Sequence, residues 1–413
     1  MEERIRISIP DATSVDWGFL RDEPYFLYRL ISDQDRAVLG VGCIRQLDEP
    51  VFNDHGAVED WCFGALRYEW KDALEPALGR SKEQVSEPHC RWFIPRFVVE
   101  WKGEEVSMHV LHEDSVVARE WASGFFRHGA KVPVGPEFEW VEQFDRGGYL
   151  GEVAVLMQHI RRGDIYEVNY CIPRRARSNT FDPFGAFARL LERSAAPYAG
   201  FFRWNDAFAV CASPERFMAF EKDRILGQPM KGTRPRSLDR QVDERLRREL
   251  AADEKERSEN VMALDVMRHD FSKVAAPGSV LVRDLCAVVS LPKVHQMVST
   301  VSASLRSGLT PYDALAAAFP MASMTGAPKV RAMQLIEAAE KGPRGLFSGS
   351  LGFFAPDGTG DWNVVIRSLL FDAATGGASI HTGSAITAMC DPEMEWEECQ
   401  LKARSVIDAI GHA

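Results

Sequence analysis

The sequence DPEMEWEECQLKA, residues 391–403, predicts a helix that has both an apolar face and an acidic face. Asp391 can cap the first turn, and Pro392 fits within that turn. We expect the helix to continue to Ile410 and to end at Gly411. Its apolar face would consist of Cys399, Ala403, Val406, Ile407 and Ile410. One side of this helix is therefore suited to the core, and another is rich in carboxylates.

The acidic face is repeated on a second predicted helix. Glu395 and Glu398 are three residues apart and so share a helix face. The sequence ERSENVMALDVMRHD, residues 256–270, has the same spacing between Glu256 and Glu259. Two such faces brought together would offer the oxygen ligands that Mg²⁺ prefers. The alternative is that both are solvated surfaces, because acidic side chains are mostly exposed.

Apolar spacing elsewhere predicts a mixture of strands and helices. Strands are expected at residues 4–9, 92–101, 106–111 and 165–171, and helices at residues 149–162, 246–274 and 312–319. The sequence KVPVGP, residues 131–136, contains two prolines and a glycine, and this composition predicts a linker. The pattern indicates a mixed α/β protein with a boundary near the end of its first third.

Composition limits the classes of function. The 413 residues carry a net charge of −11, and 46% of them are hydrophobic, as in a globular protein. The acidic charge argues against general binding to nucleic acid or to an anionic membrane. The eight cysteines lack metal-site or redox spacing, so we expect reduced thiols. With no signal peptide and no apolar run of about 18 residues, the predicted location is cytoplasmic.

Three further segments combine small or basic residues with an irregular backbone. Residues 228–236, QPMKGTRPR, predict a turn-like stretch in which Lys231 could bind an anion or act as a nucleophile. The alternative there is a basic surface loop. Residues 319–331, FPMASMTGAPKVR, predict a loop that enters a helix, where N–H groups could meet a carboxylate. Residues 381–387, HTGSAIT, are small enough for the backbone to approach a ligand closely.

Taken in order, these segments resemble the chorismate-utilising enzymes, which include component I of anthranilate synthase and of aminodeoxychorismate synthase, and the isochorismate and salicylate synthases. The resemblance covers residues 150–410, and its matching runs are GDIYEVNYC (163–171), ASPERF (212–217), PMKGTRPR (229–236), ERSENVMALDVMRHD (256–270), VHQMVSTV (294–301), FPMASMTGAPKVRAM (319–333), GSLGFF (349–354), NVVIRS (363–368) and DPEMEWEECQLKA (391–403).

The resemblance implies a fold and a domain organisation. The fold would be of the α/β (α+β) type, with packed antiparallel sheets and helices outside. Residues 145–411 would form the chorismate-binding catalytic domain, and residues 1–135 would form an N-terminal variable region that completes it.

Two positions separate the activities within this family. Isochorismate and salicylate synthases carry a lysine base where this chain has Glu167, so water activation by that lysine is not expected. Aminodeoxychorismate synthases often carry a lysine at the position of Lys231, where the anthranilate and isochorismate types usually have alanine. The chain therefore resembles most the aminodeoxychorismate synthase branch, which supplies the precursor of 4-aminobenzoate for folate.

The resemblance implies a covalent mechanism. Lys231 would attack C2 of the chorismate ring while Glu215 protonates the departing C4 oxygen as general acid. Ammonia, delivered from glutamine by a glutamine amidotransferase partner (component II), would then attack C4 and expel the lysine. A nucleophilic Lys231 needs a lowered pKa, or must lose its proton when the substrate binds.

The remaining site residues are also assigned by resemblance. Glu259 and Glu398 match Mg²⁺ ligands, and Glu256 and Glu395 would stand beside them. The expected substrate-binding residues are Arg367, Lys402, Thr325, Gly326, Gly383 and Gln296. The family often has a histidine at the last of these positions, where it is linked to pyruvate elimination. Two alternatives stay open: an anthranilate synthase component I, and a non-catalytic partner of a glutamine amidotransferase.

Overall fold

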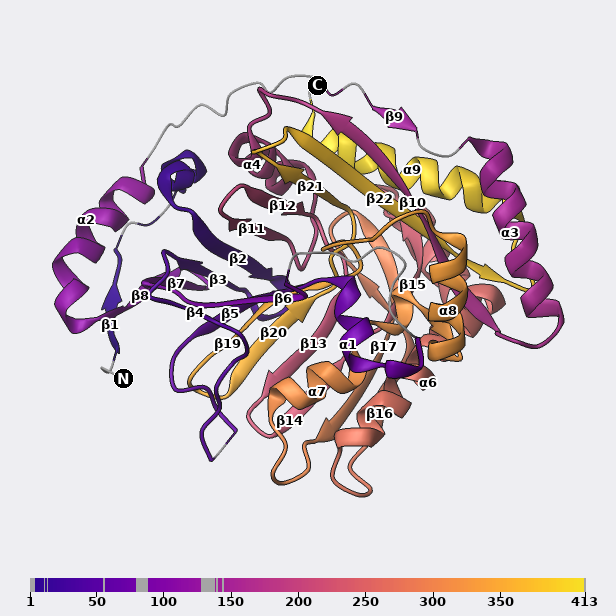
Figure 1. Cartoon of the computed structure of the whole chain (residues 1–413), viewed down its shortest axis with the longest axis horizontal. Coiled ribbons are helices and arrows are strands. Elements are labelled where there is room, and N and C mark those ends of the chain that lie inside the picture. Colours follow the sequence, from indigo (N-terminus) through magenta and orange to yellow (C-terminus); the bar gives the residue numbers. More distant parts are fainter. Residues whose placement is uncertain are drawn as a thin grey trace.

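The computed structural model describes residues 4–10, 12, 14–54, 56–78, 88–127, 138, 140–142 and 145–411. These residues form two large antiparallel sheets with helices around the outside (Figure 1). The architecture confirms the predicted mixed α/β fold with packed antiparallel sheets. The linker predicted at residues 131–136 lies outside the described residues.

The first sheet has twelve strands among the described residues. Strand β9 (Val141–Glu142) pairs with β10 at the side of the main path. The order along the main path is β1 (Arg4–Ser8), β8 (Glu105–Leu111), β7 (Phe97–Lys102), β3 (Arg36–Val41), β2 (Tyr25–Ile31), β11 (Gly200–Trp204), β12 (Ala207–Cys211), β21 (Ser368–Asp372), β22 (Gly377–Thr387), β10 (Glu167–Arg177) and β18 (Gly326–Ala327).

The second sheet has ten strands within the same described ranges. Strand β16 (Leu281–Ser290) pairs with β17 beside the main path. The main path runs through β15 (Met230–Pro235), β17 (Val294–Ser304), β14 (Arg224–Gly227), β13 (Arg216–Glu221), β20 (Thr359–Asn363), β19 (Ser350–Phe354), β5 (Cys62–Leu66), β6 (Cys90–Ile94) and β4 (Arg45–Leu47). Strands from both sides of the predicted boundary therefore belong to the same two sheets.

Helices cover the outer faces of the sheets and their ends (Figure 1). Helix α9 packs on β22, and α6 packs on β17. The helices are α1 (Lys71–Leu74), α2 (Ser115–Phe125), α3 (Arg146–Arg161), α4 (Pro183–Arg193), α5 (Arg240–Ala252), α6 (Glu254–Val274), α7 (Pro311–Ala318), α8 (Lys329–Ala339) and α9 (Pro392–Ile410). Among the described residues, no helix is both long enough and apolar enough to cross a membrane.

A hydrophobic cluster fills the space between the two sheets. Leu27 and Val38 of the first sheet meet Phe63, Phe93 and Leu351 of the second in this cluster, and all five are fully buried. Burial on both faces explains why strands such as β3 are apolar almost without alternation. The sheets thus share one core.

A buried ion network also joins the sheets. Arg29 of β2 donates to Asp361 Oδ1 of β20 at 2.6 Å, and Arg216 Nε of β13 donates to Asp361 Oδ2 at 2.7 Å. Removing one member would leave buried charge uncompensated, which destabilises strongly. The network fixes Arg216 directly after Glu215, at the start of β13.

Two predicted elements are wrong in extent. The strand expected at residues 92–101 is two strands, because the chain turns at Pro95, and β6 and β7 belong to different sheets. The helix expected at residues 246–274 is broken at Asp253, whose backbone is extended. The Asp253 side chain accepts from Glu256 N at 3.1 Å and so caps the new helix α6.

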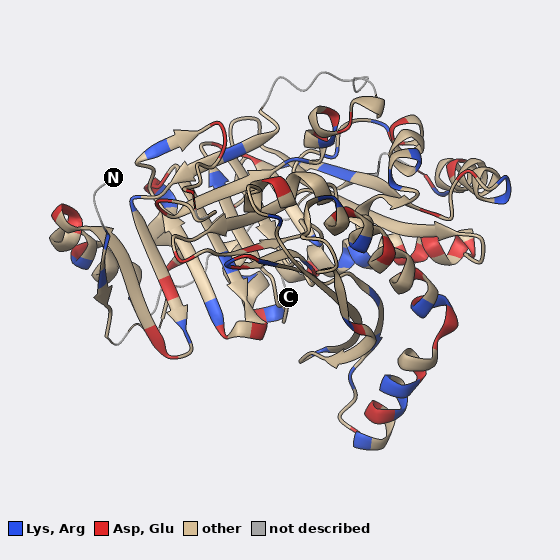
Figure 2. Ribbon diagram, turned by 90° about the horizontal axis from the view of Figure 1, so that it is seen from below, with Lys and Arg blue, Asp and Glu red and all other residues tan. Residues whose placement is uncertain are grey.

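The first predicted strand and the last predicted helix are confirmed. The first strand is β1, and α9 has Asp391 as its N-cap, Pro392 in its first turn and Gly411 at its C-cap. All eight cysteines are free thiols. Lysine and arginine are interspersed with acidic residues along the ribbon (Figure 2).

Candidate active site

The predicted catalytic lysine lies on a terminal strand of the second sheet. The segment expected to be a turn is instead strand β15, which pairs with β17. The strand pairing shifts register between Lys231 and Thr233, where Gly232 has a φ of +76°. The irregular backbone predicted from glycine and proline is therefore a β-bulge, and it sits directly after Lys231.

Lys231 is surrounded by carboxylates. Its ammonium donates to Glu167 Oε1 at 2.5 Å and lies 3.9 Å from Glu259 Oε2. Burial alone would lower the pKa of Lys231, but the carboxylates of Glu167, Glu259 and Glu215 raise it above its ordinary value. The lowered pKa expected as one route to a neutral amine is therefore not found for Lys231. Of the two routes to a neutral amine, proton loss on substrate binding is the one that remains.

Glu215 is poised as a proton donor. The side chain is buried, and burial raises its pKa to about 7, against smaller lowering effects of Ser323 and Lys231. Its backbone carbonyl accepts from the Ser213 hydroxyl and from Val364 N, both at 3.1 Å. Glu215 is therefore held rigidly and stays largely protonated up to near-neutral pH, as a general acid requires.

The four predicted metal-ligating glutamates lie on the two helices α6 and α9. Lys255 of α6 joins the helices, because its ammonium donates to Glu395 Oε1 of α9 at 3.1 Å and lies 3.9 Å from Glu259 Oε1. Burial raises the pKa of Glu256, and Glu398 of α9 is near enough to add to that rise. The tertiary structure brings both acidic faces together.

The donor set fits a hard divalent cation in kind. Glu259 Oε1 is buried without a hydrogen-bond partner among the described residues, and burial raises the pKa of Glu259 to about 7. A cation would satisfy this oxygen. No group of three or more His, Cys, Asp or Glu side chains is gathered to hold a metal ion within the part of the chain that the structure describes. Glu398, half exposed, is instead paired with Lys402 at 2.8 Å.

Of two predicted anion-binding residues, Lys402 lies on α9 and Arg367 contacts it. Lys402 donates to Gly383 O of β22 at 2.8 Å, which ties the helix to the strand. Arg367 Nη1 donates to Ser405 Oγ at 3.0 Å. Burial lowers the pKa of Arg367, and Glu398 opposes that shift. Both cations therefore lie on the side of the molecule where α9 carries its acidic face.

Two predicted glycines are required by close strand contacts. Gly326 has a φ of +147°, and a Cβ atom there would lie 2.1 Å from Glu167 O of β10. At Gly383 a Cβ atom would lie 2.4 Å from Cys171 Sγ. Thr325 is buried, and its hydroxyl donates to Met321 O at 3.0 Å within its own loop. These residues shape the wall beside Glu167.

Gln296 holds the bulge after Lys231. Its amide Nε2 donates to Gly232 O at 2.8 Å, and its Oε1 accepts from Thr233 Oγ1 at 2.9 Å. The neighbouring His295 lies on the opposite face of β17, where it contacts Asp243 at 3.0 Å. In this structure the amide predicted to bind substrate is used to fix the backbone of β15.

Sequence reasoning missed the roles of Glu167 and Lys255. The family comparison of sequences used Glu167 only to exclude a lysine base at that position. In the structure Glu167 is the closest carboxylate to Lys231 among the described residues. Lys255 carries no motif signal at all. Both roles depend on contacts between elements that are distant in sequence, so spacing along the chain could not indicate them.

Comparison with known proteins assigns the chain to a family. Residues 28–408 match the family described as chorismate binding enzyme. The chain belongs to the chorismate binding enzyme family. The match begins well inside the region predicted to be variable. It includes strands of both sheets and every residue predicted for the site.

The chain is similar to relatives that are named for two different activities. An aminodeoxychorismate synthase of Streptomyces griseus is 41% identical over 65% of this chain and 37% of the relative. Aminodeoxychorismate synthase component 1 of Salmonella typhimurium is 34% identical over 76% of this chain and 68% of that relative. Anthranilate synthase component 1 of Thermus thermophilus is 40% identical over 65% of this chain and 57% of that relative. The chain thus spans little more than a third of the Streptomyces protein.

Solved structures of the family show the same fold. Anthranilate synthase component I from Streptococcus pneumoniae superposes with a TM-score of 0.76 at 21% identity, covering 98% of this chain and 92% of that one. At this identity the likeness concerns the fold alone.

Proposed function

We propose that this chorismate binding enzyme is the synthase component of an aminodeoxychorismate synthase, which converts chorismate and ammonia to 4-amino-4-deoxychorismate. The observation that carries the proposal is the position of Lys231, whose side chain is 11% exposed and lies between Glu167 and Glu259, with Glu215 near enough to raise its pKa. A nucleophile, a proton acceptor and a proton donor are thus present in one place. Similarity to named aminodeoxychorismate synthases supports the same assignment.

The first half of the reaction forms a covalent adduct. Lys231 transfers its proton to Glu167, and the neutral amine attacks C2 of the ring. The two conjugated ring double bonds shift, the C4–O bond breaks, and Glu215 supplies the proton with which the C4 hydroxyl leaves as water. The raised pKa of Glu215, about 7, keeps that proton available.

The second half releases the product. Ammonia attacks C4, the two ring double bonds shift back, and the bond between C2 and Lys231 breaks. Glu215, now a carboxylate, takes the proton that ammonia loses. The balance is one chorismate and one ammonia consumed, with one aminodeoxychorismate and one water produced. The ammonia is proposed to come from a glutamine amidotransferase partner or from free ammonium.

Mg²⁺, when bound by Glu259 and Glu398 with Glu256 and Glu395 beside them, would neutralise a substrate carboxylate and orient it. Arg367 and Lys402 supply further positive charge at the α9 side. Gly326 and Gly383 leave room for the substrate next to β10 and β22. Gln296 keeps the Lys231 backbone in place.

The experiment that tests this proposal is mass spectrometry of the products formed from chorismate, Mg²⁺ and ammonium. Aminodeoxychorismate without pyruvate is the expected result. Anthranilate with pyruvate would replace the proposal by the second candidate, an anthranilate synthase component I, which similarity to the Thermus protein favours. No turnover at any ammonium concentration, with or without an amidotransferase, would indicate a non-catalytic partner.

A further inference from the structure

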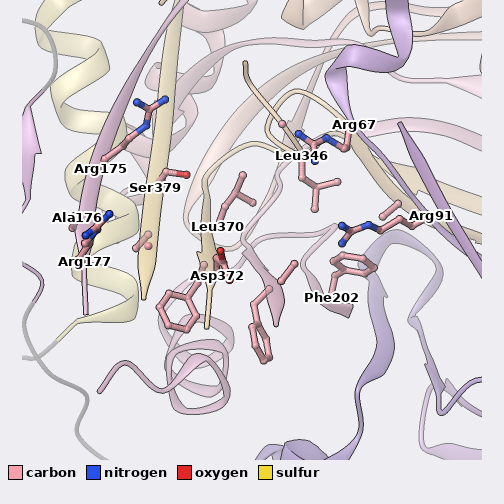
Figure 3. A pocket seen from close by; sticks show the side chains of 17 residues that line it. Arg67, Arg91, Arg175, Ala176, Arg177, Phe202, Leu346, Leu370, Asp372 and Ser379 are labelled. Carbon is pink, nitrogen blue, oxygen red and sulfur yellow. The ribbon is translucent and has the colours of Figure 1, made fainter. Parts of the chain in front are cut away.

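A cleft lined by residues of both sheets contains none of the candidate active-site residues. Figure 3 shows this cleft from close by. It has a volume of about 770 Å³, within the range of small-molecule sites. Strands β5 and β6 of one sheet line one side, and β10, β21 and β22 of the other sheet line the opposite side. Arg175 in this cleft is eight residues along β10 from Glu167, a distance of about 26 Å in a strand. The two sites therefore do not overlap.

The cleft is basic although the protein is acidic. Its lining includes four arginines but a single acidic residue, and these are Arg67, Arg91, Arg175, Arg177 and Asp372. Figure 3 shows Arg175 and Arg177 on one side and Arg67 and Arg91 on the other. Local positive charge of this kind raises the local concentration of anions against a net charge of −11.

Only part of this positive charge is compensated. Arg67 lies 3.6 Å from Glu69, and Arg91 stacks over the Trp204 ring at 5.6 Å. Asp372 is engaged by its own turn, since it accepts from Ala374 N at 3.0 Å. By contrast, no carboxylate of the described residues lies within ion-pair distance of Arg175 or Arg177, and both are exposed. The uncompensated charge thus lies on the β10 wall.

The floor between the arginines is apolar. Phe202, Leu346 and Leu370 lie between the two basic walls (Figure 3). Such a floor favours a flat ring, and the fork of a guanidinium matches the two oxygens of a carboxylate. We propose that this cleft binds an aromatic or cyclic carboxylate, with its ring on the apolar floor and its carboxylate on Arg175 and Arg177. This site is independent of the proposed function.

Isothermal titration calorimetry with benzoate tests the proposal. Benzyl alcohol, which keeps the ring but lacks the charge, and inorganic phosphate, which keeps the charge but lacks the ring, are the matched probes. The test variant is Arg175→Gln/Arg177→Gln. The control variant is Arg119→Gln/Arg224→Gln, which removes the same charge from two exposed positions outside the cleft.

We expect benzoate to bind the wild type and the control variant equally, and to bind the test variant at least tenfold more weakly. Benzyl alcohol and phosphate should each bind at least tenfold more weakly than benzoate. Saturating chorismate should leave benzoate binding unchanged, because the sites are separate. The proposal is overturned if benzoate does not bind, if both variants weaken it alike, if either probe matches it, or if chorismate displaces it.

Discussion

Lys231 and Glu167 belong to different sheets and meet at 2.5 Å. Lys231 lies on β15, the terminal strand of the second sheet, and Glu167 begins β10 near the end of the first. The candidate active site is therefore formed where the two sheets meet, and neither sheet contains it alone.

Replacing the lysine should abolish amination. Lys231→Ala is expected to lower kcat by at least about 10³-fold, because the proposed adduct forms through the Lys231 amine. Product mass spectrometry under saturating ammonium measures the loss. Lys222→Asn, a change at an exposed turn lysine, is the control and should keep full activity. Comparable turnover by Lys231→Ala would show that ammonia attacks the ring directly.

Glu167 should matter for rate more than for binding. Glu167→Gln keeps a hydrogen-bond acceptor for Lys231 but removes the proton acceptor, so kcat is expected to fall about 10²-fold. KM for chorismate should change by less than about threefold, and Glu167→Asp should recover part of the rate. A merely structural role would lower both variants' melting temperatures and raise KM instead. An unchanged kcat in Glu167→Gln would contradict the proposed proton transfer.

Glu215 should set the alkaline limit of activity. Its protonated form is required, and burial raises its pKa to about 7, so kcat/KM should fall as the pH rises through about 7. In Glu215→Gln this limb should disappear and the rate should drop by about 10²–10⁴-fold. A pH–rate profile of both proteins measures this. Retention of the same limb in the variant would assign it to another group.

Mg²⁺ binding should weaken in acid. The metal needs ionised Glu259, whose pKa burial raises to about 7, so apparent affinity should fall as the pH drops below about 7. Calorimetric titration with Mg²⁺ at several pH values measures this directly. Glu259→Gln should weaken binding at least about tenfold at every pH. Glu249→Gln, on the exposed face of α5, is the control. Equal affinity in Glu259→Gln would exclude it as a ligand.

Gly326 should be required for stability. In Gly326→Ala the new methyl group would meet Glu167 O at 2.1 Å, so we expect unfolding free energy to fall by about 2–4 kcal/mol. Gly151→Ala is the matched control, because nothing lies within 4 Å of its Cβ position in α3. That change should raise the unfolding free energy by about 0.5–1 kcal/mol. Chemical denaturation measures both, and equal effects would contradict the strand contact.

Features that depend on neighbours along the chain could be predicted from the sequence. The spacing around Asp391 and Pro392 predicted the last helix to its ends, because caps and apolar periodicity are local. The three-residue spacing placed Glu256 beside Glu259, and Glu395 beside Glu398, on their own helix faces. The ordered motifs indicated the family, which residues 28–408 confirm.

The way these pieces combine depends on contacts between elements that are distant in sequence. A local pattern could not show that the chain changes sheets at Pro95, or that Asp253 breaks the long helix. The partner of Lys231 is 64 residues away in sequence and lies on another sheet. The charge state of that lysine depends on such long-range carboxylates, because electrostatic energies are set by distance and burial in space and not by position along the chain.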